Sequence, residues 1–222
     1  MGTTIELTAA DGHKFAAYRA DPSGKPRGAI VVVQEIFGVN HHMRQVSDGF
    51  AAQGYLAISP ALFDRTKRGV ELGYDETGIA SGRELRGAVG DDGPLADIQA
   101  SVDLAAKAGK VAVIGYCWGG TLAYLSATRL KGIACAVGYY GSGIAAAAAE
   151  KTRVPVMLHF GETDHGIPMS DVDKVRDAHP EVTIYVYKAG HGFNCDERGS
   201  YDAGSAKVAS DRTLAFVKDN IG

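Results

Sequence analysis

Hydrophobic and polar residues alternate along the chain in segments that predict strands and helices in turn. Residues 3–20 form two short alternating runs around an Asp-Gly pair, which is typical of a hairpin turn. Residues 28–35, GAIVVVQE, are a continuous β-branched run of the kind buried in a parallel sheet. Apolar residues then repeat at helical spacing over residues 40–53, and the segment YLAISPALF that follows predicts another strand. The first part of the chain therefore has a βαβ rhythm.

A long interruption follows this first unit. Residues 64–93 are rich in glycine and charge and show only a weak helical pattern at 79–86. Loops of such length are uncommon inside compact domains unless they have a function. Residues 94–109 then predict an amphipathic helix, with Pro94 at its start and Gly109 just past its end.

Four further strand candidates complete the chain, with the sequences VAVIGY, IACAVGYYG, VPVMLHFG and VTIYVYKAG. A helix is expected after the first and the third, and a final helix over about 201–220. The second strand leads into SGIAAAAAEK, which fits either a short helix or a loop. No internal repeat or linker is evident. We therefore predict one α/β domain over residues 1–222, a mostly parallel sheet covered by helices on both faces.

Composition and charge exclude several classes of function. The 222 residues are 45% hydrophobic and 22% charged, which is ordinary for a globular protein, and the formal net charge is −3. Neither a nucleic-acid partner nor an anionic membrane surface is expected from this balance. GYYGSG at 138–143 lacks the G-x-G-x-x-G order of a dinucleotide loop, so no nucleotide cofactor is predicted.

The cysteines and the N-terminal segment bear on the compartment. Three cysteines without close spacing predict free thiols in a reducing compartment, with neither a disulfide framework nor a Cys-rich zinc site. The first residues show no secretion signal, and no apolar run approaches the roughly 20 residues that span a bilayer. The expectation is a cytoplasmic monomer without a metal or an organic cofactor.

One cysteine stands where a nucleophile is expected. Residues 115–119 read G-x-C-x-G between a strand and a helix, the form of a nucleophile elbow. In this turn the flanking glycines let strand and helix approach closely, and the helix N-terminus favours a thiolate. The alternative is a buried cysteine that only fills space, which is the expected role of Cys135 and Cys195. For Cys117 the position between strand and helix favours catalysis.

A thiolate nucleophile needs a histidine and an acid that orients it. In α/β-hydrolases the chain order is nucleophile, acid, histidine, each at the end of its own strand. Asp164 follows VPVMLHFG, and His191 follows VTIYVYKAG, so Cys117, Asp164 and His191 have this order. His165 is a competing base, but it shares a loop with the acid. His159 is expected in the core, and His41 and His42 at a solvated helix start.

Five segments in sequence order resemble the dienelactone hydrolase family: QEIFGVN, GYCWGG, AVGYYG, GETDHGIP and AGHGF. The resemblance covers most of the chain and implies an α/β-hydrolase fold. It implies hydrolysis of a conjugated enol-lactone, a carboxymethylenebutenolide, to maleylacetate in the catabolism of aromatic compounds. The expected partner is accordingly a small ester or lactone that carries a carboxylate.

The resemblance also implies roles for individual residues. Cys117 is the nucleophile, His191 the general acid and base, and Asp164 its orienting partner. Glu35 would pair with the thiol and take its proton when substrate binds, since two adjacent negative charges are unfavourable. The backbone N–H groups of Ile36 and Trp118 would stabilise the oxyanion.

Substrate binding is where the sequence departs from the family. Arginines are expected to bind the substrate carboxylate, one in the insertion and one shortly after the catalytic histidine. Arg83 and Arg86 are both available in the insertion. Cys195 stands about where the second arginine is expected, and Arg198 comes three residues later. Tyr139 is a further candidate for contact with substrate, and Trp118 replaces a smaller aliphatic residue beside the nucleophile.

Other functions compatible with the same residues remain open at this stage. A carboxylesterase or thioesterase of broader specificity would use the same catalytic groups in a different pocket. A non-catalytic ligand-binding protein of the same fold would have no reason to keep Cys117, His191, Asp164 and Glu35 together. A redox-sensing role for Cys117 lacks a second cysteine placed to resolve it.

Overall fold

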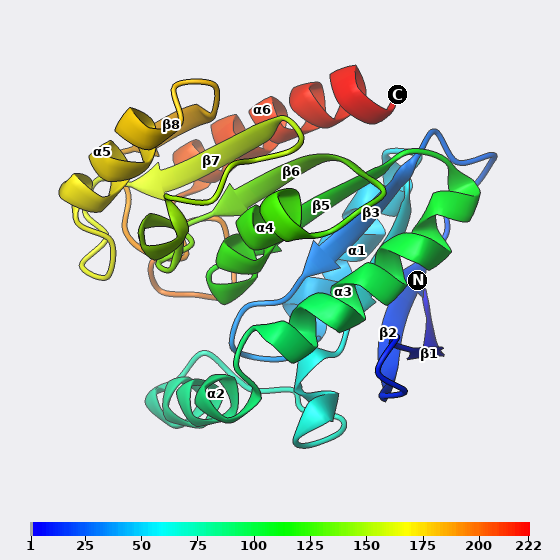
Figure 1. The fold of residues 1–222 in the computed structure, drawn as a ribbon. Coiled ribbons are helices and arrows are strands. Elements are labelled where there is room, and N and C mark those ends of the chain that lie inside the picture. The colour runs from blue at the N-terminus through cyan, green and yellow to red at the C-terminus, as the bar shows by residue number, and fades with distance from the viewer. Residues whose placement is uncertain (1) are drawn as a thin grey trace.

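The computed structural model describes residues 2–222, in which eight strands form one sheet (Figure 1). Its strand order is β1-β2-β4-β3-β5-β6-β7-β8. The first pairings, β1 with β2 and β2 with β4, are antiparallel, and all other neighbours are parallel. The mostly parallel sheet expected from the sequence is confirmed. The strands are β1 (Thr3–Thr8), β2 (Lys14–Ala20), β3 (Ala29–Val33), β4 (Leu56–Pro60), β5 (Val111–Tyr116), β6 (Ile133–Tyr139), β7 (Val156–Gly161) and β8 (Thr183–Tyr187).

Helices cover both faces of the sheet, as predicted. Helices α3 and α4 lie on one face, and α1 and α6 on the other (Figure 1). Strand β3 shows why both faces need cover: Ile30 and Val32 belong to one hydrophobic cluster, and Val31 and Val33 to another. The helices are α1 (His41–Ala52), α2 (Glu76–Val89), α3 (Asp92–Ala105), α4 (Trp118–Arg129), α5 (Met169–Ala178) and α6 (Ala203–Ile221).

The interruption in the sequence pattern contains a full helix, which the sequence only hinted at. Helix α2 runs over Glu76–Val89, well beyond the predicted 79–86. The side chain of Asp75 caps it by accepting from the N–H of Gly78 at 2.7 Å. Its three glycines lower helix propensity and remove side chains from the apolar pattern, which hides the helix in the sequence.

Two other boundaries differ slightly from the prediction. Helix α3 begins at Asp92, two residues before Pro94. Proline is tolerated there because the backbone N–H groups of a first helical turn have no acceptor within the helix, so the missing N–H costs no hydrogen bond. The helix passes into a short 3₁₀ turn, Ala106–Ala108, ahead of Gly109, whose φ is 142°.

The segment after β6, for which the sequence fits either a short helix or a loop, contains the 3₁₀ turn Ile144–Ala147. A further 3₁₀ turn, Leu62–Arg65, follows β4.

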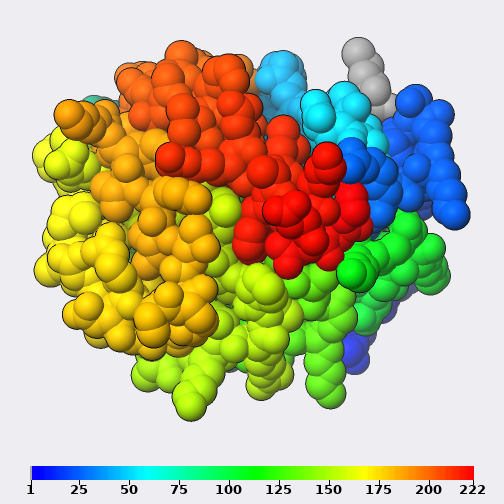
Figure 2. Space-filling model, turned by 90° about the horizontal axis from the view of Figure 1, so that it is seen from above, coloured from blue at the N-terminus to red at the C-terminus, as the bar shows by residue number. Residues whose placement is uncertain are grey.

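The C-terminal helix ties the end of the chain back to its beginning. Figure 2 shows α6 lying across one face, with its red C-terminal end beside blue residues of the N-terminal segment. The hydroxyl of Tyr55 donates to the carbonyl of Gly222 at 2.8 Å. Within residues 2–222, no helix is long and apolar enough to cross a membrane.

Candidate active site

The nucleophile elbow is built as the glycine spacing predicts. Cys117 joins β5 to α4 with φ 54° and ψ −118°, a left-handed conformation that is strained for a residue with a side chain. A Cβ on Gly115 would lie 1.8 Å from the carbonyl oxygen of Gly119, and one on Gly119 would lie 2.3 Å from that of Val33. Only glycines permit this approach, and the turn places the half-exposed thiol at the carboxyl edge of the sheet.

Two other strand ends bring the acid and the base to the same edge. The Nε2 atom of His191 lies 3.2 Å from Sγ of Cys117, and its Nδ1 atom lies 2.7 Å from Oδ2 of Asp164. The Asp164 side chain is fully buried, and its other oxygen accepts from the N–H of Gly166 at 2.8 Å. This carboxylate is therefore fixed from both sides and holds the imidazole ring in one orientation. His165 is exposed and makes neither contact.

The electrostatics of His191 favour its protonated form. Burial alone would lower the pKa of this imidazole, but its hydrogen bonds to Asp164 and Cys117 outweigh burial and raise the pKa to about 10. A positively charged ring beside the sulfur stabilises a thiolate. The arrangement can stabilise the Cys117 sulfur as a nucleophile, and the imidazolium of His191 can supply a proton to a leaving group.

The backbone around the thiol offers two candidate donors to an oxyanion. Trp118 occupies the first position of α4, where an N–H has no acceptor within the helix. Ile36 follows β3 and lines the same cavity as Cys117. Within residues 2–222 its N–H donates to no protein acceptor.

Glu35 does not meet the expected partner. Its Oε1 accepts from Nη1 of Arg198 at 3.1 Å, whereas within the described chain it makes no hydrogen bond to Cys117. Glu35 is 1% exposed, and a carboxylate so deeply buried needs a charged partner. Burial, the largest effect, would lower the pKa of Arg198, but the charge of Glu35 together with those of nearby thiol and phenol groups outweighs it and raises the pKa. The other oxygen of Glu35, Oε2, is buried and has no hydrogen-bond partner among residues 2–222.

A cavity of about 750 Å³ opens above the thiol. Three arginines, Arg83, Arg86 and Arg198, line it together with Cys117 and His191. Arg83 is exposed and Arg86 half-buried on α2, and within residues 2–222 neither forms an ion pair. Arg198 also lies over the rings of Phe37 and Tyr74, at 5.6 and 5.8 Å from their centroids.

Tyr139 is not brought to this cavity. It is 1% exposed in β6, and its hydroxyl lies 2.6 Å from Oγ1 of Thr213 in the core. The next residue, Tyr140, packs its ring 5.1 Å from that of His191 instead, with a φ of 38°. Tyr140 directly follows the last residue of β6, and its buried ring packs beside the imidazole of His191.

Tyr139→Phe is therefore expected to lower stability and leave substrate binding unchanged. Losing the hydrogen bond to Thr213 should reduce the free energy of unfolding by about 1 kcal/mol. Denaturant unfolding measures this loss, and KM for an aryl ester serves as the second readout. A several-fold rise in KM with unchanged stability would contradict this placement.

The side chain of Trp118 also points away from the cavity. It is 1% exposed and stacks on Phe63 with ring centroids 5.5 Å apart. Its Nε1–H donates to Oδ1 of Asp91 at 2.9 Å, in the connection between α2 and α3. The large ring beside the nucleophile thus anchors the insertion.

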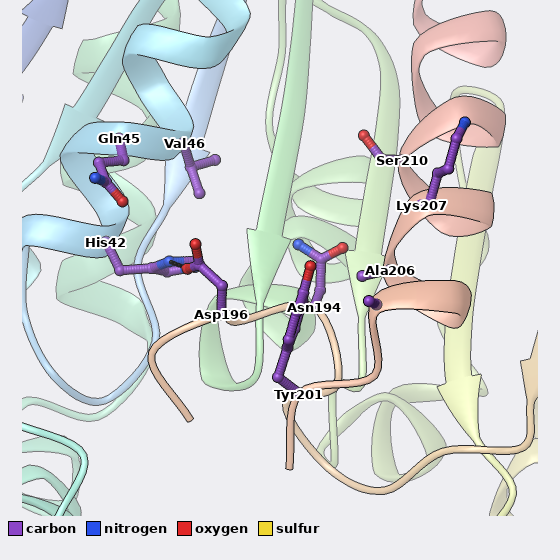
Figure 3. A pocket seen from close by; sticks show the side chains of 10 residues that line it. His42, Gln45, Val46, Asn194, Asp196, Tyr201, Ala206, Lys207 and Ser210 are labelled. Carbon is purple, nitrogen blue, oxygen red and sulfur yellow. Dashed lines mark hydrogen bonds and ion pairs between the residues drawn. The ribbon is translucent and has the colours of Figure 1, made fainter. Parts of the chain in front are cut away.

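A second cavity, of about 340 Å³, lies between α1 and the start of α6, away from the thiol (Figure 3). His42, expected to be solvated, is 4% exposed there, and its Nδ1 lies 3.0 Å from Oδ1 of Asp196. His42, Cys195 and Asp196 could approach a metal, since their ligand atoms lie within 4.8 Å of one another. The Nδ1 atom of His42 is already hydrogen-bonded to Asp196, and this bond connects α1 to the loop after His191.

Burial raises the pKa of Cys195 to about 12, so its thiol is protonated at neutral pH.

Several residues around the site carried no distinct signal in the sequence. Phe37 and Ile79 supply apolar lining, and Ser142 and Thr163 supply hydroxyls. Ser142 and Thr163 lie in the loops just after β6 and β7, at the catalytic edge, and this placement is the signal that could have identified them.

Comparison with known sequences places the chain beside hydrolases of one kind. The sequence profile described as the dienelactone hydrolase family matches residues 15–221. Carboxymethylenebutenolidase from Pseudomonas putida is 34% identical over 224 residues, which cover 96% of this chain and 94% of that protein.

Solved structures agree over nearly the whole chain. A Klebsiella pneumoniae protein, named provisionally as a dienelactone hydrolase, superposes with a TM-score of 0.83 at 32% identity, covering 97% of this chain and 98% of that one. A dienelactone hydrolase-like promiscuous phosphotriesterase from metagenomic libraries superposes with a TM-score of 0.80 at 20% identity, covering 100% and 99%. The second likeness concerns the fold alone.

Proposed function

The chain belongs to the dienelactone hydrolase family, and from this premise we propose that it hydrolyses an ester or lactone through a thioester on Cys117. The observation that carries the proposal is the hydrogen-bonded series from Cys117 through His191 to Asp164, at 3.2 and 2.7 Å. The substrate we propose is a carboxymethylenebutenolide, a lactone bearing a carboxylate, and the product is maleylacetate.

Acylation uses the thiolate and the imidazolium together. The sulfur of Cys117 attacks the lactone carbonyl, and the C=O π electrons move to oxygen, where the N–H groups of Ile36 and Trp118 donate to the oxyanion. When the carbonyl re-forms, the ring C–O bond breaks and His191 protonates the departing enolate oxygen. The result is a thioester whose acyl chain still carries the released enol.

In deacylation His191 accepts a proton instead of donating one. The neutral imidazole takes a proton from water, and the resulting hydroxide attacks the thioester carbonyl. Collapse of the second tetrahedral intermediate breaks the C–S bond and releases the acid. The thiolate and the imidazolium are restored, and the free enol rearranges to the ketone of maleylacetate. Every step uses residues of this chain and water.

The ion pair between Glu35 and Arg198 would keep the nucleophile inactive until substrate binds. A substrate carboxylate that binds Arg198 competes with Glu35 for the guanidinium. The released Glu35 takes the proton of the resting thiol before acylation, leaves the thiolate that attacks, and returns this proton to the sulfur when the product departs. Among residues 2–222, its Oε2 has no hydrogen-bond partner and so has free acceptor capacity for this proton. Binding and activation would thus be linked through one arginine.

The two arginines of α2 should discriminate between anionic and neutral substrates. Arg83→Gln and Arg86→Gln each remove a positive charge from the cavity wall without breaking an ion pair. At least one of them is expected to raise KM for a dienelactone by roughly tenfold, the equivalent of about 1.4 kcal/mol. KM for a neutral aryl ester should change less than twofold. An equal rise in KM for both substrates would show that these arginines do not recognise the carboxylate.

A carboxylesterase or thioesterase of broader specificity is the second candidate. Its support is that Arg198 is already occupied by Glu35, while Arg83 is exposed to solvent. Steady-state kinetics of the wild type on cis- and trans-dienelactone beside neutral aryl esters separates the two candidates. A large preference in kcat/KM for the lactones supports dienelactone hydrolysis, and comparable values support the broader esterase.

A further inference from the structure

Helix α2 contacts the backbone of Ile36 through a glycine. A Cβ built on Gly82 would lie 2.2 Å from the carbonyl oxygen of Ile36 and 3.1 Å from its carbonyl carbon. Gly78 and Gly82, spaced one turn apart, are the buried residues of this helix. The backbone of α2 therefore rests directly on Ile36, which lines the cavity.

The end of the same insertion contacts the second oxyanion residue. Asp91 lies just past α2 and accepts from Nε1 of Trp118 at 2.9 Å. Within the described chain the Asp91 side chain forms no capping bond to α3, so its hydrogen bond to the indole is not shared with a helix cap. Trp118 is buried, and its ring and its backbone N–H belong to one rigid first turn of α4.

We propose that α2 and its connection to α3 position both oxyanion donors, with Gly82 setting the Ile36 backbone and Asp91 setting Trp118. Gly82 and Asp91 are thus positioning residues that act through the two N–H groups. The inference rests on the proposed function, because it assigns Ile36 and Trp118 to the oxyanion. It gives the long insertion a role in the chemistry beyond lining the cavity.

The expected size of the effect follows from geometry. A methyl group on residue 82 must open a 2.2 Å contact to more than 3 Å, so α2 or Ile36 shifts by close to 1 Å. Oxyanion donors act over 2.7–3.1 Å, and a misplacement of about 1 Å costs roughly 100-fold in rate. Gly82→Ala is therefore expected to lower kcat by roughly 10- to 100-fold with little change in KM.

Gly87→Ala is the matched control on the same helix. A Cβ at Gly87 meets no atom of residues 2–222 within 4 Å, so this variant adds the same methyl group without touching Ile36. It should keep the wild-type kcat, KM and thermal stability or gain slightly in stability. Asp91→Ala provides a second, independent disturbance and is expected to lower kcat severalfold.

Alkylation of Cys117 by iodoacetamide separates positioning from general damage. In this reaction the sulfur displaces iodide from a saturated carbon, so no oxyanion forms and the hole is not needed. The inference expects Gly82→Ala and Asp91→Ala to be alkylated at close to the wild-type rate while their ester turnover falls. Wild-type kcat in both variants, or a parallel fall of turnover and alkylation, would overturn it. If Gly82→Ala does not accumulate as a folded protein, Asp91→Ala decides by the same two readouts.

Failure of this inference differs from failure of the proposed function. A wild-type protein that forms an acyl adduct on Cys117, with Gly82→Ala and Gly87→Ala indistinguishable in turnover, overturns only the positioning role. Ester turnover that persists in Cys117→Ala overturns the proposed function itself.

Discussion

Cys117→Ala is expected to lower kcat/KM for an ester by at least roughly 10⁴-fold, because the remaining groups can bind and polarise the substrate but form no acyl-enzyme. The thiol lies 3.2 Å from Nε2 of His191 on a strained turn that positions it for attack. Steady-state hydrolysis of an aryl ester measures the effect. An unchanged thermal midpoint would show that the loss is chemical.

Cys135→Ala is the control for this experiment. Cys135 is fully buried in β6, and burial raises the pKa of its thiol to about 12, so it is protonated at neutral pH. This variant should keep kcat/KM within a few fold of the wild type, although the small cavity it creates lowers stability. Cys117→Ala with wild-type turnover would contradict the nucleophile assignment.

Asp164→Asn is expected to lower kcat by roughly 10³–10⁴-fold while leaving the fold intact. The amide can still accept from the N–H of Gly166, but its NH₂ then faces Nδ1 of His191 and cannot accept from it. The ring is left in the wrong tautomer to serve Cys117. A loss smaller than tenfold would contradict the role of Asp164.

The same variant should shift the pH dependence in a defined direction. Burial lowers the pKa of His191, but hydrogen bonds to Asp164 and Cys117 raise it to about 10 in the folded protein. Hydrolysis of an alkyl ester, whose alkoxide needs a proton to leave, should therefore fall as pH rises through about 10. Asp164→Asn removes one of the stabilising contacts and should move this limb to lower pH.

Stability is linked to the same proton. A group whose pKa is raised on folding contributes stability that is complete below its unfolded value of about 6.5 and is lost as pH rises toward the folded value. The free energy of unfolding of the wild type should therefore contain a term from His191 that disappears between neutral pH and about pH 10. Asp164→Asn should flatten this dependence.

The Cys117, Asp164 and His191 cluster could be predicted from the sequence because one simple rule governs it. Each residue lies in the connection that follows an apolar strand, and the carboxyl ends of parallel strands meet at one edge of the sheet. The G-x-C-x-G spacing adds a backbone requirement that only a tight turn explains. The positions of these three residues therefore follow from local sequence patterns, which can be recognised without the structure.

Contacts between distant segments could not be predicted in the same way. The pairing of Glu35 with Arg198 joins residues 163 positions apart, and the bond from Trp118 to Asp91 depends on how the insertion folds back. Helix α2 was underestimated because its buried face is formed by glycines, which contribute no apolar signal. The sequence predicts contact between Tyr139 and substrate, but the tyrosine points into the core, because the face to which a buried strand residue points depends on the packing of the sheet.

The most direct test of the account is the covalent intermediate. Wild-type protein is mixed with an aryl ester, quenched in acid within the first turnovers, and digested for peptide mass spectrometry. The account predicts the mass of one acyl group on the peptide that contains Cys117, and its removal by hydroxylamine, which cleaves thioesters. An acyl group on another residue, or full ester turnover with no adduct on Cys117 and undiminished activity in Cys117→Ala, would contradict it.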